Sequence, residues 1–461
     1  VFILTDDQRY NTIAALGNTQ IKTPNMDRLV HSGTSFTHAH IPGGTSGAVC
    51  MPSRAMLNTG RTLLHLEGEG QTIPTEHTTM GEMFKENGYH CFGTGKWHNS
   101  PQAYARSFSD GENIFFGGMW DHWNVPMCFY DPTGEFDNVI DFVCDYSLNR
   151  KTTKVHCDKF NPGKHSSEVL TETSVNAIKS MPKDKPFFLY TAYLAPHDPR
   201  TMPEKFKNMY KPEDIVLPDN YMTEHPFDFG VFNIRDEKLA AYPRVEGEVR
   251  EHLAEYFGMI THLDHEIGKI ISALEETGEL ENTIIVLAGD NGLGLGSHAL
   301  FGKQNHYDHS IRVPLIFSGK GIPQGEIRDN YVYLLDIFPT LCDLLGYKIP
   351  SSVEGKSFAK SFEDATYKTR KDLFFVYNDL LRSVKDEQYK LIEYRPSKEY
   401  NTSLVRTQLF DLKNDPSEIN DLYGKEEYKE VVNKLRERLQ EYRKEWGDDN
   451  HRYGQQFWAN Y

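Results

Sequence analysis

Residues 283–289 constrain the fold most, because they read Thr-Ile-Ile-Val-Leu-Ala-Gly without alternating polar and apolar side chains. A strand that is apolar on both faces must be covered on both sides, as central strands of parallel α/β sheets are. Further buried strands are expected at residues 1–5, 89–94 and 185–195, and residues 247–277 show the spacing of a long amphipathic helix. The sequence therefore predicts an α/β fold with a large mixed, mostly parallel sheet sandwiched by helices.

The pattern changes beyond about residue 350. Short β-prone runs separated by brief turns occur at residues 373–377, 381–384, 389–392 and 408–412, and one amphipathic helix is expected at residues 425–446. Closely spaced short strands favour antiparallel pairing. We therefore predict a large α/β domain over residues 1–365 and a smaller α+β domain, with an antiparallel sheet and one long helix, over residues 366–461.

Composition argues against several classes of protein. The 461 residues include 66 acidic and 50 basic side chains, for a formal net charge of −16. This charge disfavours non-specific binding of nucleic acid, and the absence of a run of about 18 apolar residues predicts no membrane span. Six cysteines in a chain of this length are not a disulfide scaffold. Cys128, Cys144 and Cys157 cluster, so one bridge is possible, but spacing does not decide the pairing.

The stretch from residue 100 to 165 shows little periodicity and is rich in glycine, aspartate and aromatic residues. A long irregular stretch of this kind is typical of a functional insertion. Its aromatic residues either line a sugar subsite or give the loop its own small core, and we favour the small core: Trp120, His122, Trp123 and Tyr130. His252, His262 and His265, on or near the predicted long helix, are interpreted as structural.

Polar residues follow four of the predicted strands at their carboxyl ends: Asp6 and Asp7, Lys96 and His98, His197, and Asp290 and Asn291. In α/β sheets the ligand crevice lies outside these ends, so we expect the side chains to converge. Adjacent buried carboxylates at positions 6 and 7 are unfavourable without a positive charge between them. A divalent cation with oxygen ligands is the simplest remedy. A plain polar exit from the strand is the alternative.

A glycine-rich loop over residues 43–47 leads to Cys50, and Pro52 suits the first turn of a helix that follows. A side chain at a helix start lies near unpaired backbone N–H groups and the positive end of the helix dipole, which favours an anion. Arg54, one turn on, and Lys303 add positive charge. A metal and cations around a nucleophile suit displacement at a sulfate or phosphate ester. A buried structural cysteine is the alternative for Cys50.

Two motifs carry a family resemblance. Residues 50–54, Cys-Met-Pro-Ser-Arg, followed by Thr-Gly-Arg at 59–61, resemble the signature of the type I sulfatases of the alkaline phosphatase superfamily. Residues 95–98, Gly-Lys-Trp-His, resemble the second signature of that family; they are not a phosphate-binding P-loop, because Trp97 stands where Ser or Thr is required. The layout of the chain is similar to this branch, and most similar to bacterial sulfatases of glycosaminoglycan fragments.

The resemblance implies a cofactor and a modified residue. Cys50 would be oxidised to formylglycine by a maturation enzyme, and its aldehyde hydrate would attack sulfur to form a covalent sulfate intermediate. One calcium ion would be bound by the side chains of Asp6, Asp7, Asp290 and Asn291, with residue 50 completing the shell.

The resemblance also implies roles for the basic residues. Lys96 and Lys303 would hold sulfate oxygens, and Arg54 would orient residue 50. His98 would help the remaining hydroxyl collapse and expel sulfate, and His197 would be the acid for the leaving alcohol.

The expected function is a sulfuric ester hydrolase that removes O-sulfate from a sulfated carbohydrate, a glycosaminoglycan oligosaccharide, with a lean towards uronate 2-O-sulfate. One alternative is a phosphonate monoester or phosphodiester hydrolase, because such relatives share the formylglycine signature. Another is a non-catalytic glycan-binding protein that keeps Cys50 unmodified. The resemblance implies a periplasmic or secreted protein, whose signal peptide would lie upstream of residue 1.

Overall fold

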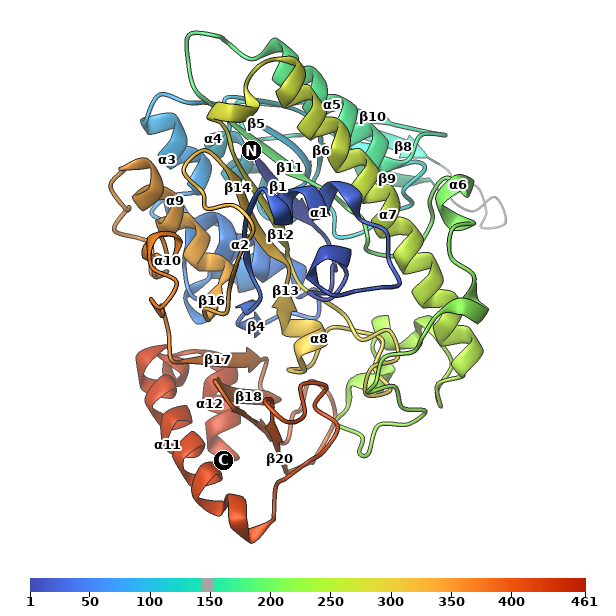
Figure 1. The fold of residues 1–461 in the computed structure, drawn as a ribbon, viewed down its shortest axis with the longest axis vertical. Helices are drawn as coiled ribbons and strands as arrows, with labels where there is room; N and C mark the ends of the chain where they lie inside the picture. Colours follow the sequence, from blue (N-terminus) through green and yellow to red (C-terminus); the bar gives the residue numbers. More distant parts are fainter. Residues whose placement is uncertain (143–151) are drawn as a thin grey trace.

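A large central sheet organises the chain. The computed structural model describes residues 1–142 and 152–461. The sheet has eight strands in the order β15-β2-β14-β12-β1-β11-β5-β6, with helices on both faces (Figure 1). Its strands are β1 Phe2–Thr5, β2 Gly33–Phe36, β5 His90–Lys96, β6 Asp110–Phe115, β11 Phe187–Ala192, β12 Ile284–Gly289, β14 Leu315–Gly319 and β15 Glu326–Arg328.

The helices around this sheet are α1 Pro24–His31, α2 Cys50–Thr59, α3 Met80–Glu86, α4 Pro101–Ser107, α5 Ser166–Ser180, α6 Glu204–Lys207, α7 Glu246–Glu276, α8 Asp308–Ile311, α9 Ile337–Leu345 and α10 Lys360–Glu363. Short strands in smaller sheets are β3 Ala39–His40, β7 Pro126–Met127, β8 Val139–Phe142, β9 Thr153–His156, β10 Lys159–Phe160, β13 Arg312–Val313 and β16 Val332–Tyr333. Among the helices of the described residues, none is both long and apolar enough to cross a bilayer.

Strand direction confirms the predicted mixed, mostly parallel sheet. Strands β12, β1, β11, β5 and β6 run parallel to one another, whereas β14 is antiparallel to both β12 and β2. In β1, Ile3 lies opposite Thr191 on one side and Leu287 on the other. This register brings the carboxyl ends of the four central parallel strands to one edge.

The two faces of β1 contribute to different hydrophobic cores, as expected for a strand that is covered on both sides. Phe2 and Leu4 belong to a cluster with side chains of α2, α3 and α9, including Met56. Ile3 belongs to a second cluster with side chains of α1, α5 and α7, including Leu263. All three strand residues are 1% exposed or less, which fixes the strand in the centre of the molecule.

A second sheet occupies the C-terminal part of the chain, at the bottom of Figure 1. Strands β17 Asp372–Tyr377, β18 Leu381–Asp386, β19 Tyr389–Tyr394 and β20 Arg406–Asp411 pair antiparallel in chain order. The long helix is α11, Lys429–Glu445. The predicted antiparallel sheet and helix are therefore confirmed, and a short helix that was not predicted, α12 Arg452–Ala459, follows them.

The second sheet extends into the loop that precedes Cys50. Strand β4, Gly43–Gly44, pairs parallel with β17. A Cβ atom at Gly43 would lie 2.1 Å from the carbonyl oxygen of Val376, and its φ is +106°, so only glycine allows this approach. The C-terminal sheet thus contains residues from both sides of the predicted domain boundary between residues 365 and 366. That boundary remains a prediction.

The aromatic residues of the irregular stretch pack against the two main clusters: Tyr130 borders the cluster of Phe2 and Leu4, and Trp120 borders the cluster of Ile3. Tyr130 donates hydrogen bonds to the backbone oxygens of Ala105 and Phe108, at 3.0 and 2.8 Å. The ring of Trp123 packs against His165, with 5.3 Å between centroids. Tyr130 and Trp120 therefore join the main cores, and the separate loop core that we favoured is not confirmed.

The cysteine cluster contains two free thiols. Cys128 and Cys157 are both buried and unbridged. Cys144 lies outside the described residues.

A buried ion network joins the second sheet to the large domain. Lys390 Nζ lies 2.6 Å from Asp308 Oδ1 and 2.6 Å from Glu418 Oε1, and it donates to the backbone oxygen of His306 at 3.0 Å. Lys385 Nζ lies 2.7 Å from Asp308 Oδ2. Both lysines are 1% exposed or less. Charges this deeply buried are tolerated only in pairs.

Removing one member of this network should therefore destabilise the protein strongly. We predict that Lys390→Met costs about 3–5 kcal/mol, because Glu418 loses its buried lysine and Asp308 keeps only Lys385 of its two lysines. The measurement is the midpoint of urea unfolding. Lys429→Met is the matched control, because Lys429 is a 67% exposed side chain paired with Glu426 and should leave the midpoint unchanged. Equal midpoints for both variants would contradict the network's role.

Candidate active site

The four central strands place the predicted polar residues together. Because β12, β1, β11 and β5 are neighbours in the sheet, their carboxyl ends meet, and the segments that follow them carry Asp290 and Asn291, Asp6 and Asp7, His197, and Lys96 and His98. Helix α2 begins at Cys50 beside them. A cavity of about 350 Å³ is lined by residue 50 together with His98, His197 and Lys303. All predicted site residues therefore converge.

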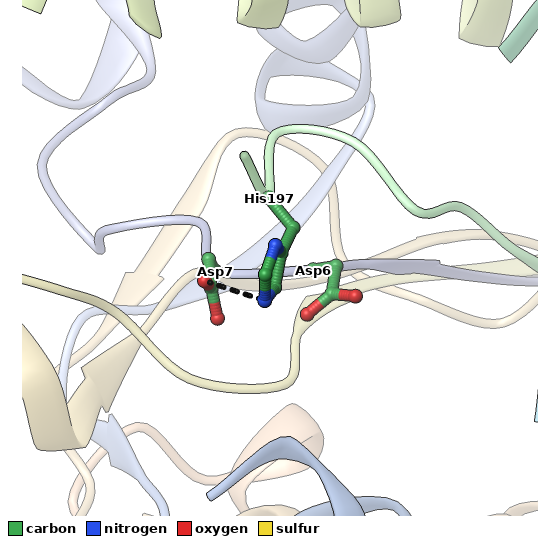
Figure 2. Close-up of side chains that lie close together, drawn as sticks. All are labelled: Asp6, Asp7 and His197. Carbon is green, nitrogen blue, oxygen red and sulfur yellow. Dashed lines mark ion pairs between the residues drawn. The ribbon is translucent and has the colours of Figure 1, made fainter. Parts of the chain in front are cut away.

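Three carboxylates lie at the bottom of this site. The exposed fractions of Asp6, Asp7 and Asp290 are 0%, 3% and 0%. The backbone N–H of Asp7 donates to Asp290 Oδ1 at 3.0 Å, which holds the two residues together. Figure 2 shows Asp6 and Asp7 on either side of the His197 ring. His197 Nε2 lies 3.6 Å from Asp7 Oδ2.

Each carboxylate has a cationic partner. Lys96 Nζ lies 2.5 Å from Asp6 Oδ2, and Lys303 Nζ lies 2.6 Å from Asp7 Oδ1. The third pair joins Arg54 Nε to Asp290 Oδ2 at 2.9 Å. The three pairs set three carboxylates against three cationic side chains, and all six residues are 5% exposed or less.

The pKa values of two carboxyl groups diverge. Burial disfavours ionisation of Asp6, but Lys96 and Arg54 outweigh it and hold the pKa of Asp6 well below its usual value. Burial and the charge of Asp6 raise the pKa of Asp290 to about 7. The divergence shows the strain of placing like charges together, which a divalent cation would relieve.

The oxygen atoms that remain free suit such a cation. Asp6 Oδ1 and Asn291 Oδ1 are buried and have no hydrogen-bond partner among the described residues. Ligand atoms of Asp6, Cys50 and Asp290 lie within 4.8 Å of one another, as do those of Asp6, Asp7 and His197. Carboxylate and amide oxygens are the ligands that calcium prefers. The four residues predicted to bind metal therefore fit a hard divalent ion.

Cys50 lies among three basic side chains. Its Sγ is 3.4 Å from His98 Nδ1, 3.6 Å from Lys96 Nζ and 4.0 Å from Lys303 Nζ. Burial raises the pKa of the thiol. Burial also holds the pKa of His98 well below its usual value, so the imidazole is neutral. Burial opposes the charge of Lys303, but Asp7 outweighs it and holds the lysine's pKa well above its usual value.

Arg54 connects helix α2 to the strand ends. Its guanidinium is 0% exposed and donates through Nη1 to the backbone oxygen of Lys96 at 2.5 Å, in addition to its bond with Asp290. The neighbouring Ser53 Oγ donates to the backbone oxygen of Asp290 at 2.6 Å. These bonds fix the start of the helix, and with it residue 50, against β5 and β12.

Several supporting residues were not predicted from the sequence. Glu237 accepts hydrogen bonds from the backbone N–H groups of residues 301 and 302, at 2.9 and 2.7 Å, and so holds one side of the Lys303 loop. Glu418 Oε2 accepts from the backbone N–H of Asp308 at 2.7 Å on the other side. Both acidic residues are distant from the loop in sequence, and no local motif marks them.

Comparisons with known proteins agree with this site. Residues 1–347 match the Sulfatase family model, and residues 296–445 match the model described as N-sulphoglucosamine sulphohydrolase, C-terminal. An arylsulfatase from Clostridium perfringens is 28% identical over 471 residues, covering 95% of this chain and 93% of that protein. N-acetylglucosamine-6-O-sulfatase from Bacteroides thetaiotaomicron is 25% identical over 533 residues, covering 98% and 87%. A solved structure in complex with its substrate D-glucosamine-2-N,6-O-disulfate has a TM-score of 0.76 at 22% identity, covering 98% of both chains.

The structural match identifies the alkaline phosphatase-like α/β fold, with its crevice at the carboxyl ends of the central strands. The matched family model spans most of the chain. The chain therefore belongs to the sulfatase family, and it is a sulfuric ester hydrolase.

Gly118 is predicted to control the position of His98. A Cβ atom at residue 118 would lie 2.9 Å from His98 Nε2, so Gly118→Ala must displace the imidazole. We expect at least a tenfold loss of turnover of nitrophenyl sulfate, because small misplacements of reacting groups are costly, up to about 100-fold for 1 Å. Gly247→Ala is the control, since its Cβ would meet nothing within 4 Å. Full activity of Gly118→Ala would show that the ring has room to move.

Proposed function

We propose that this protein is a carbohydrate sulfatase, which removes O-sulfate groups from a sulfated sugar. The surroundings of Cys50 Sγ carry the proposal. This atom lies within 4.0 Å of His98 Nδ1, Lys96 Nζ and Lys303 Nζ. Two ammonium groups beside one nucleophile position suit a reaction that builds negative charge on the oxygens of a sulfate group.

Residue 50 would act after a maturation enzyme has oxidised Cys50 to formylglycine. In that form it supplies an aldehyde hydrate, whose oxygen displaces the sugar alcohol from sulfur and which returns to the aldehyde when sulfate leaves. Its position at the start of α2 supports this role, because the positive end of the helix dipole favours an anion there. Arg54 would keep residue 50 in place through its bonds to Asp290 and to the backbone of Lys96.

Lys96 and Lys303 would bind the non-bridging oxygens of the sulfate group. Both ammonium groups are within 4.0 Å of Cys50 Sγ, and both now contact carboxylates, Asp6 and Asp7 respectively. Sulfate binding would add a second anionic partner to each lysine. Both lysines are 5% exposed or less, so their charges are poorly screened by water and act strongly on a transition state.

Two histidines would move protons on opposite sides of the reaction. His98 is neutral, and its Nδ1 lies 3.4 Å from Cys50 Sγ, so it is placed to accept a proton from residue 50. His197 Nδ1 donates to the backbone oxygen of Asp198 at 2.8 Å, which orients Nε2 towards Asp7 and the site. We infer that His197 acts as an imidazolium, with a proton on each ring nitrogen, and that Nε2 donates its proton to the leaving sugar oxygen.

A calcium ion would be held by Asp6, Asp7, Asp290 and Asn291, with residue 50 completing its shell. Bound there, it would compensate the buried carboxylates and withdraw electron density from an oxygen of residue 50 or of the sulfate. The unpartnered oxygens Asp6 Oδ1 and Asn291 Oδ1 support this assignment.

The sugar class rests on relatives. One relative is an N-acetylglucosamine-6-O-sulfatase, and one structural neighbour is in complex with its substrate D-glucosamine-2-N,6-O-disulfate, which supports a glycosaminoglycan fragment as substrate. The lean towards uronate 2-O-sulfate remains a prediction of the sequence resemblance. By the same analogy with glycan sulfatases, we propose a periplasmic or secreted location.

Two measurements test the proposed function: the substrate preference of the mature protein, and the modification and substitution of Cys50. Mature protein should carry an aldehyde in the peptide around Cys50 by mass spectrometry, and should hydrolyse nitrophenyl sulfate faster than a nitrophenyl phosphonate ester. A panel that contains uronate 2-O-sulfate and glucosamine 6-O-sulfate identifies the sugar. Cys50→Ala should abolish turnover, whereas Cys342→Ala, at another buried free cysteine, should retain it. Preference for the phosphonate would favour the alternative hydrolase, and no turnover of any ester would favour a glycan-binding protein.

Calcium dependence is the second test. We expect Asp290→Asn to weaken calcium affinity at least tenfold and to lower turnover by about 100-fold or more, because a metal ligand and its charge are lost. Asp264→Asn is the control: Asp264 is a 1% exposed carboxylate on α7 that accepts a hydrogen bond from the backbone of Met26. Calorimetric titration measures the affinity. Unchanged affinity in Asp290→Asn would remove this residue from the metal shell.

A further inference from the structure

A second cluster of ligand-type side chains lies where α5 packs against α7. Glu168 stands in the first turn of α5, and His262 and Glu266 stand one turn apart on α7. One ligand atom from each residue lies within 4.8 Å of the others. None of the three lines the cavity over Cys50.

The cluster contains buried polar atoms that lack partners. His262 and Glu266 are each 1% exposed. Both ring nitrogens of His262, and Oε2 of Glu266, have no hydrogen-bond partner within the described part of the chain. Leaving an imidazole and a carboxylate oxygen unpaired in the interior is costly, and each such group in a folded protein needs an explanation.

Among the described residues, the neighbouring groups make no hydrogen bond to these atoms, and His262 Nε2 lies 3.7 Å from Glu266 Oε1. Lys269 Nζ occupies the other oxygen of Glu266, Oε1, at 2.6 Å, and the lysine side chain is 46% exposed. Glu168 Oε2 accepts from the backbone N–H of His165 at 3.4 Å.

We propose that Glu168, His262 and Glu266 bind a divalent transition metal ion, with Zn²⁺ as the best match, that fastens the first turn of α5 to α7. One imidazole nitrogen and two carboxylate oxygens form a ligand set that Zn²⁺ accepts, whereas calcium prefers oxygen ligands alone and disfavours the imidazole. A tetrahedral shell has ligand atoms about 3.3 Å apart, from metal–ligand distances of about 2.0–2.1 Å. Binding would draw the three side chains together, and water would take the fourth position.

The site would stiffen the structure behind His197. The ring of His262 packs against His165, with 4.7 Å between centroids, and His165 stacks on His122 at 4.9 Å. His122 Nε2 in turn lies 3.0 Å from the backbone oxygen of His197. An ion bound to His262 would restrain the imidazole ring at the start of this series of contacting histidines. Its main effect is on stability, so the proposal does not depend on the function of Cys50.

The test uses full-length protein with Cys50→Ala, so that the thiol at the active site cannot bind the metal probe. The protein is stripped with a chelator, supplied with excess calcium, and titrated with Co²⁺ and then Zn²⁺. We expect one equivalent of Co²⁺ to give visible absorption bands of a low-coordinate site, Zn²⁺ to displace it, and Zn²⁺ to raise the thermal unfolding midpoint.

Three variants locate the site. His262→Phe keeps an aromatic ring against Phe206 and His165, and Glu266→Gln keeps the side-chain shape; each should weaken Zn²⁺ affinity at least about 100-fold. His265→Phe, at the neighbouring histidine on α7, is the control and should bind normally. If neither variant changes the Co²⁺ spectrum or the Zn²⁺ shift, or if no stoichiometric metal binds, the proposal is wrong. Absence of sulfatase activity in the mature protein would contradict the proposed function of Cys50. It would not change the metal-binding result, which is measured in the Cys50→Ala protein.

Discussion

The structure depends on how three buried carboxylates are placed at one edge of a sheet. Asp6, Asp7 and Asp290 are each 3% exposed or less, and each pairs with a lysine or arginine. Without these cations the carboxylates could not stay ionised in the interior. With them, the cluster is neutral and compact. A divalent cation bound to this cluster would give it a net positive charge. That charge would attract an anionic ester to the site although the whole chain has a net charge of −16.

The fold holds this cluster from several directions. The sheet order brings four strand ends together, and Arg54 fixes helix α2 to two of them. The second sheet contributes through β4 and β17, which pair beside the loop that leads to residue 50. It contributes again through Lys390, which bonds to the backbone of His306 and to Asp308, a few residues after Lys303. The C-terminal sheet is therefore part of the scaffold of the active site.

Much of this was predictable from the sequence, because the information is local. An apolar run followed by polar residues marks both a central strand and the crevice at its carboxyl end, and all the predicted site residues converge. The parts that were not predicted depend on contacts between distant segments. Glu237 and Glu418 clamp the Lys303 loop from positions with no motif, and Gly118 makes room for His98 from inside an irregular stretch. The sequence predicts a structural role for His262 on α7, and the approach of Glu168 to it depends on how α5 packs against α7.

The two lysines of the site link anion binding to cation binding. In the structure Lys96 and Lys303 are engaged by Asp6 and Asp7, the same carboxylates proposed to bind calcium. A cation on those carboxylates would weaken their hold on the lysines and free both ammonium groups for sulfate oxygens. A sulfate group that drew the lysines away would leave the carboxylates more negative and more attractive to calcium. Linkage requires these two effects to be equal in free energy, so under the proposed function the metal and the substrate would stabilise each other's binding.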